Sequence, residues 1–167
     1  MTDFEAALAD QLSRNADLVA QRHHAEAEMD RALAEREEAA RAKAQRDQDE
    51  RNERHAALAD HLSRVAGQLK AASPDTFIVR TGWTQSREEF RAKISTRQTR
   101  PARTLMIELD RDDDQVMARW NTDVGSSVEL WRLLQVTPEM LSQLVLQVAD
   151  EGVWRTGGSP PPFPSSA

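Results

Sequence analysis

The sequence predicts an α+β protein, with a long N-terminal α-helix of the coiled-coil type followed by a small antiparallel-sheet domain with two C-terminal helices. Two observations predict this class. Residues 1–72 contain one glycine and no proline, whereas short β-branched runs begin only after Pro74. All four tryptophans lie beyond Asp75, so the large core-forming side chains are C-terminal. We therefore expect a helical oligomerisation segment over residues 1–72, a domain over 75–155 and a flexible Pro/Gly/Ser tail over 156–167.

The prediction of a long helix rests on residue type and on charge spacing. Alanine, glutamate and arginine are strong helix formers and dominate this segment. Acid-to-arginine pairs at the favourable i, i+4 spacing recur, for example Asp10 with Arg14 and Glu37 with Arg41. Between Ala34 and Ala57 no apolar side chain is larger than alanine. The middle of the helix is therefore expected to be a solvated spacer.

A nine-residue stretch occurs twice in the predicted helix. AALADQLSR, residues 6–14, returns with one change as AALADHLSR, residues 56–64. Each copy begins a heptad seam, and the expected oligomerisation residues are Leu8, Leu12, Asn15, Val19, Met29 and Leu33 in the first seam and Leu58, Leu62, Val65 and Leu69 in the second. Arg22 and Glu26 fill further polar positions of the first seam. Because each buried Leu or Val contributes about 1.5 to 3 kcal/mol, we expect both seams to find a partner.

Pairing between two chains is the favoured interpretation of the two seams. An antiparallel dimer would set Leu8 against Leu69, Leu12 against Val65 and Val19 against Leu58. A parallel dimer, with Asn15 facing Asn15, is the second alternative. Association with a different protein and an intrachain hairpin turning near residues 46–52 are the others, although turn-forming residues are absent where a symmetric reversal would fall.

The C-terminal half shows the alternation that is typical of strands. We expect strands over 76–80, 104–109 and 115–120, and a hairpin at the acidic stretch between the last two. Residues 86–95 fit a strand or a helix, and the strand is favoured. We also expect two helices, one over 127–135 and one that begins at Pro138 with Thr137 as N-cap and ends at Gly152.

A basic block lies within the predicted sheet. Residues 75–104 contain seven Lys or Arg and three Asp or Glu, although the whole chain has a net charge of -6. The candidate polyanion-binding residues are Arg80, Arg87, Arg91, Lys93, Arg97, Arg100 and Arg103. Trp83 and Phe90 are interleaved with them and could stack on bases. The alternatives are nucleic-acid binding, an acidic protein partner and a solvated or ion-paired surface.

Other patterns give weaker indications of function. The acidic cluster from Asp110 to Asp114 resembles a calcium loop only at its first, third and fifth positions, so a solvated turn is the favoured interpretation. The four histidines have no metal-chelating spacing and are expected to be solvent-exposed. The chain has no cysteine and none of the common catalytic or nucleotide-binding motifs. We therefore expect no metal, no cofactor and no enzymatic activity.

These observations predict a non-enzymatic interaction or scaffold protein. It would self-associate through the helix and present the α+β domain to a partner. The alternative is a nucleic-acid-binding or regulatory protein that uses residues 80–103. The start of the sequence is acidic and no apolar run approaches the length of a membrane span, so a cytoplasmic location without membrane contact is expected.

Overall fold

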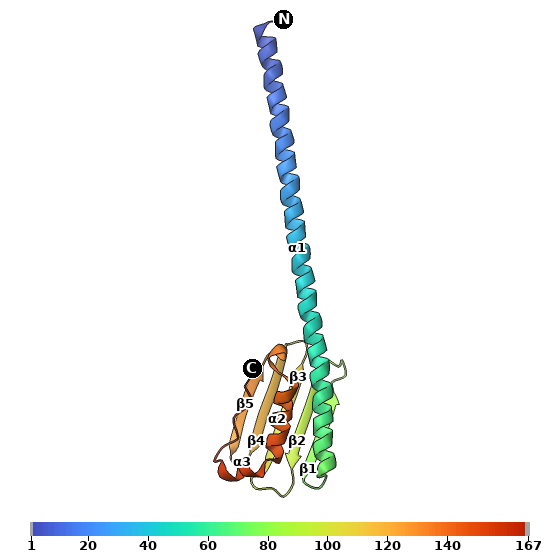
Figure 1. The fold of residues 1–167 in the computed structure, drawn as a ribbon, viewed down its shortest axis with the longest axis vertical. Coiled ribbons are helices and arrows are strands. Elements are labelled where there is room, and N and C mark those ends of the chain that lie inside the picture. Colours follow the sequence, from blue (N-terminus) through green and yellow to red (C-terminus); the bar gives the residue numbers. More distant parts are fainter. Residues whose placement is uncertain (1, 166–167) are drawn as a thin grey trace. The chain divides into compact units, whose positions relative to one another are not determined.

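The computed structural model describes residues 2–165 and has the expected α+β architecture (Figure 1). A long helix precedes a five-stranded antiparallel sheet, in which each strand pairs with the next along the chain. The elements are α1 (Asp3–Ala72), β1 (Phe77–Trp83), β2 (Glu89–Thr96), β3 (Arg103–Asp110), β4 (Gln115–Thr122), β5 (Gly125–Trp131), the 3-10 helix η1 (Leu133–Gln135), α2 (Pro138–Ala149) and α3 (Glu151–Thr156). Within the described residues, no helix is long and apolar enough to cross a membrane.

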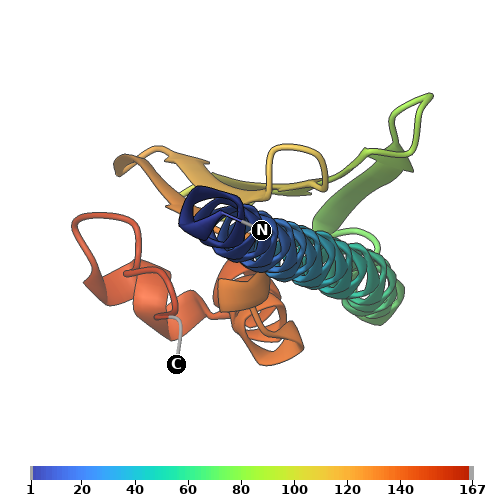
Figure 2. The same ribbon diagram turned by 90° about the horizontal axis from the view of Figure 1, so that it is seen from above.

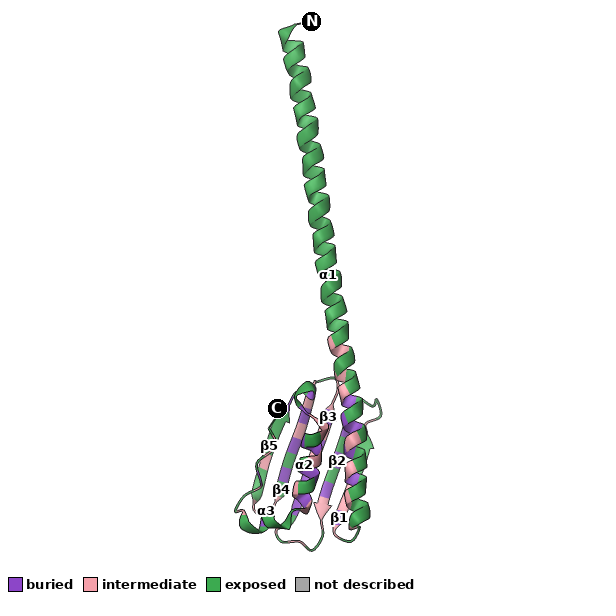
Figure 3. Ribbon diagram, in the orientation of Figure 1, coloured by how far each residue is buried: buried purple, intermediate pink, exposed green. Residues whose placement is uncertain are grey.

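The chain divides into two compact units, Met1–Asp47 and Gln48–Ala167. Helix α1 therefore contributes residues 3–47 to the first unit and residues 48–72 to the second. Every described residue up to Arg46 is exposed, as the green part of α1 in Figure 3 shows. The hairpin alternative is wrong, because residues 46–52 are helical.

The sheet buries one face, which we call the core face. Cross-strand partners share a face, so Leu105 opposite Trp120 and Ile107 opposite Ala118 lie on the core side. All four are fully buried. Residues 86–95, which fit a strand or a helix from sequence, supply β2, and the strand interpretation is confirmed.

The C-terminal part of α1 packs on the core face beside α2. Its buried residues recur at helical spacing and are His55, Leu58, Ala59, Leu62 and Ala66. They join the buried face of α2, which comprises Met140, Leu141, Leu144, Val145 and Val148. Figure 3 shows the resulting purple stripes on the strands and on this part of α1.

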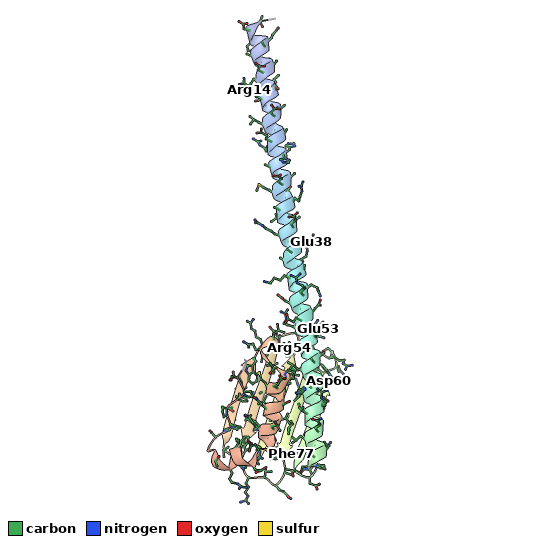
Figure 4. The ribbon with its side chains drawn as sticks, in the orientation of Figure 1. Arg14, Glu38, Glu53, Arg54, Asp60 and Phe77 are labelled. Carbon is green, nitrogen blue, oxygen red and sulfur yellow. The ribbon has the colours of Figure 1, made fainter. Side chains whose placement is uncertain are left out.

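Polar side chains of α1 attach this helix to the rest of the second unit. Nε2 of His55 bonds the carbonyl oxygen of Leu109 at 2.9 Å, and since a carbonyl can only accept, the histidine nitrogen donates. Arg54, labelled in Figure 4, donates to the carbonyl of Val136 at 2.7 Å. His61 contacts the hydroxyl of Ser142 at 2.7 Å. The expectation that all histidines are solvent-exposed is wrong, because His55 is buried and His61 is half-buried.

The end of the domain differs from the sequence prediction. The helix expected over 127–135 is instead strand β5 followed by η1. Helix α2 begins at Pro138 with Thr137 as N-cap, as expected, but it ends at Ala149 rather than at Gly152. Asp150 closes α2 and caps α3 by accepting a hydrogen bond from the backbone N–H of Val153.

The segment after α3 packs against the domain. Pro161 is buried, and Phe163 makes an edge-on ring contact with Trp131 at a centroid distance of 6.0 Å. The side-chain amide of Gln147 donates to the carbonyl of Pro162 at 3.2 Å. The sequence predicts a flexible tail over 156–167 with nothing to pack against, and these contacts show that Pro161, Pro162 and Phe163 do pack.

The two copies of the repeat provide a matched stability test. Leu62 is fully buried, so Leu62→Ala should lower the free energy of unfolding by about 2 to 5 kcal/mol. Leu12 occupies the same place in the first copy and is exposed, so Leu12→Ala should change domain stability by less than about 0.5 kcal/mol. Urea unfolding followed by tryptophan fluorescence measures this, because all four tryptophans lie in the second unit. Equal losses from the two substitutions would contradict the packing described above.

Candidate functional site

The structure separates the ten expected seam residues into two groups. Leu58 and Leu62 are fully buried against their own sheet, and Val65 and Leu69 are partly buried on the same core. Leu58 and Leu62 are therefore already covered within one chain, and Val65 and Leu69 are covered in part. The expected antiparallel register, with Leu8 against Leu69, Leu12 against Val65 and Val19 against Leu58, is therefore wrong.

The first group remains exposed, and we call it the N-terminal seam. It comprises the other six expected residues, Leu8, Leu12, Asn15, Val19, Met29 and Leu33, together with Arg22 and Glu26, which fill polar positions between them. The large apolar members range from 45% exposed at Leu8 to 71% exposed at Met29. Phe4 and Leu18 are exposed beside this seam, and the sequence analysis did not include them. Figure 4 shows side chains along this part of α1, where Arg14 is labelled.

The residues that the second copy buries in the core have identical counterparts in the first copy. The residues fifty positions before Leu58, Ala59, Leu62 and Ala66 are identical to them, namely Leu8, Ala9, Leu12 and Ala16. His55, in contrast, corresponds to Glu5, whose carboxylate cannot donate to a carbonyl as His55 does. The first copy thus carries most of a helix-docking face, while the place on the sheet is filled by the second copy.

The basic block does not form one surface. Arg80, Arg91 and Lys93 lie on the sheet face opposite the core. Arg87 lies in the turn between β1 and β2, with its guanidinium 5.3 Å from the ring centre of Trp83. Arg97 and Arg100 lie in the loop between β2 and β3 and are exposed.

Arg103 is a structural residue, which corrects its place among the candidate polyanion-binding residues. Its side chain is fully buried and donates to the carbonyl of Val148 at 2.8 Å and to that of Pro101 at 3.2 Å. It also forms an ion pair with Glu151 at 2.7 Å. All of its recorded contacts are with the protein's own residues, so an external anion would have to replace them.

Within the described residues of the second unit, 48–165, no helix covers the sheet face opposite the core. Figure 2 shows the helices of the second unit on one side of the sheet only. We call the other side the open face, and its central residues, read from the strand register, are Ile78, Arg80, Arg91, Lys93, Met106, Glu108, Met117, Arg119, Val128 and Leu130. The sequence analysis missed Arg119, because only the pairing of β4 with β3 brings it near the basic residues of β1 and β2.

Charges near the centre of the open face are partly compensated. Arg91 donates to Glu89 at 3.0 Å and lies directly opposite Glu108. Burial raises the pKa of Glu108 above its ordinary value of 4.5, and repulsion from Glu89 raises it further, while Arg91 and Arg119 act in the opposite direction. The charged form of the half-buried Glu108 is therefore less stable in the folded protein than in water.

The acidic cluster forms the expected hairpin turn between β3 and β4. One carboxylate oxygen of Asp110 accepts hydrogen bonds from the backbone N–H groups of Asp112 and Asp113. Asp114 accepts from the backbone of Leu133. The charge of Asp110 raises the pKa of Asp113. Over residues 2–165, no group of three or more His, Cys, Asp or Glu side chains is arranged to hold a metal ion.

Comparison with protein families, with curated proteins and with solved structures finds no match to this chain. The candidate sites are therefore the two surfaces that the geometry leaves uncovered, the N-terminal seam and the open face.

The raised pKa of Glu108 predicts a pH effect on stability. The folded state binds this proton more tightly than the unfolded state, so the resulting stabilisation is complete below about pH 4 and is lost as the pH rises through the folded pKa. Glu108→Gln keeps the uncharged form at every pH. The free energy of unfolding of Glu108→Gln minus that of the wild type should therefore increase as the pH rises from below 4.5. Urea titrations at a series of pH values measure this, and a difference that stays constant or falls would contradict it.

Proposed function

We propose that the protein is a non-enzymatic interaction protein that self-associates through the N-terminal seam and presents its α+β domain to a partner. The observation that carries this proposal is the different environment of the two copies. The leucines of the second copy are buried against the sheet of their own chain, whereas Leu8 and Leu12 are exposed on the same continuous helix. A stripe of apolar residues at heptad spacing favours a helical partner.

The order of apolar and polar residues along the seam is compatible with a second copy of the chain as the partner. Four of the five apolar residues lie at the two ends of the seam. Val19 and the polar residues Asn15, Arg22 and Glu26 lie near its middle. In an antiparallel pair centred between residues 20 and 21, Leu8 meets the partner's Leu33 and Leu12 meets the partner's Met29. Apolar residues thus meet apolar residues at both ends of the pair.

In the same register, each polar seam residue faces a residue with which it is compatible. Asn15 meets the partner's Glu26, and its amide can donate to that carboxylate because its side-chain oxygen already accepts from Gln11 at 2.9 Å. Val19 meets the partner's Arg22, whose long side chain can carry its charge outward to water. An in-register parallel pair would instead set Arg22 against Arg22 and Glu26 against Glu26. Like charges at facing seam positions repel, so the antiparallel orientation is favoured.

Self-association is tested by measuring molar mass as a function of concentration. Because three of the eight seam positions are polar, we expect a weak pair, and light scattering should show the average mass rising toward that of a dimer between about 1 and about 200 µM. Leu12→Glu should abolish this rise. Ala20→Glu introduces the same charge away from the seam and should leave it unchanged. A wild-type mass that stays at the monomer value throughout would refute the proposal.

The orientation is tested with single cysteines, since the natural chain has none. Oxidation of an equimolar mixture of Leu12→Cys and Met29→Cys chains should give a disulfide-linked dimer. Each variant alone should give little, because in the antiparallel pair two copies of residue 12 are separated by about 25 Å along the helices. Efficient cross-linking of Leu12→Cys with itself would establish the parallel pair instead and would leave self-association intact.

A further inference from the structure

The open face of the sheet carries an unfavourable pair of like charges. Arg80 and Lys93 are direct cross-strand partners, and the next members of the same row are Met106 and Arg119. Like charges directly opposite each other destabilise a sheet. Among the described residues, the side chains of Arg80, Lys93 and Arg119 form no ion pair or hydrogen bond, although Arg119 attracts the nearby Glu108. The row thus has three cations and no acid.

A depression between β1 and β2 lies at this row. It has a volume of about 210 Å³ and is lined by Ile78, Arg80, Lys93 and Ser95. A carboxylate placed there would meet two cations and a hydroxyl group. Binding of an anion would therefore remove the repulsion that the folded chain otherwise retains.

Apolar side chains adjoin the cations on the same face. Val128 and Leu130 of β5 are 52% and 55% exposed. Their cross-strand partners are Arg119 and the half-buried Met117, and Met106 lies opposite Arg119 on the next strand. Scattered exposed apolar residues are ordinary, but here two exposed and two half-buried apolar side chains gather on three neighbouring strands. Methionine side chains adapt to varied partner shapes.

The aromatic residues of the sheet do not lie on this face. Phe90, Trp120 and Trp131 are buried on the core side, so the alternative in which bases stack on Phe90 is excluded. Trp83 alternates with Gly82 onto the core side and contacts the rings of His55 and Phe90. Trp83 is nevertheless 38% exposed and lines a pocket with Arg80 and Arg91 at the β1 edge of the sheet. A surface for single-stranded nucleic acid combines cations with exposed aromatic rings, and no ring of the described residues lies near Lys93 and Arg119 at the centre of the open face.

We propose that the open face is a docking site for an acidic protein segment that also carries apolar side chains. Its carboxylates bind the row of Arg80, Lys93 and Arg119, and its apolar side chains cover Met117, Val128 and Leu130. The complementarity of charge and of polarity selects this class of partner. The proposal is independent of self-association, because every residue it uses lies in the second unit.

The test uses a short fluorescent helical peptide with leucine and glutamate on one face, and the same peptide with glutamine in place of glutamate. At about 50 mM salt, the full-length protein should bind the first peptide and not the second. Arg80→Glu with Lys93→Glu should weaken binding by about tenfold or more. The matched control is Arg97→Glu with Arg100→Glu, which changes the net charge equally in a loop off this face and should have little effect.

Two further variants keep the test decisive. Arg80→Glu alone replaces the like-charge pair with opposite charges, so it should raise Tm while it weakens peptide binding. Leu130→Ser leaves the charge unchanged and should also weaken binding. Equal binding of the two peptides, or equal loss in the loop control, would overturn the proposal. Tighter binding of a thymidine oligonucleotide that is lost with Arg80→Glu and Lys93→Glu would overturn it in favour of nucleic acid.

Discussion

The packing of the second copy of the repeat on the sheet is the interaction on which the rest of the structure depends. Leu58 and Leu62 fill the core between the sheet and α2, and His55 satisfies the carbonyl of Leu109 at the same interface. The strands and short helices alone would leave part of the core face uncovered, so the end of α1 completes a core that a domain of this size could hardly build otherwise. This packing also determines where the domain begins, which is within the helix and not after it.

The same packing makes the two copies unequal. Each copy carries leucine and alanine at matching positions. The leucines of the second copy are buried in the core, whereas the first copy is exposed over its whole length. Leu8 and Leu12 of the first copy therefore remain available for the self-association proposed above. The N-terminal seam lies in the first unit and the open face lies in the second, so the two proposed interactions use different residues.

The sequence predicts those elements whose signals are local. The absence of breakers predicts α1, and alternation predicts β1 to β4. Strand β5 was mistaken for a helix because it lies at the edge of the sheet, where most of its side chains are exposed and alternation is weak. The packing of Leu58 and Leu62 on the sheet is not predicted, because an apolar stripe that packs on a sheet has the same helical spacing as one that packs on a second helix. Arg103 was misjudged because its partners, Val148 and Glu151, are distant in sequence.

Amide hydrogen exchange of the two copies, followed by mass spectrometry at several protein concentrations, tests the central claim most directly. Residues 56–64 should exchange slowly at every concentration, because they unfold only with the domain. Residues 6–14 should exchange quickly in dilute samples and become protected as the concentration rises. Equal protection of both copies, independent of concentration, would contradict the account.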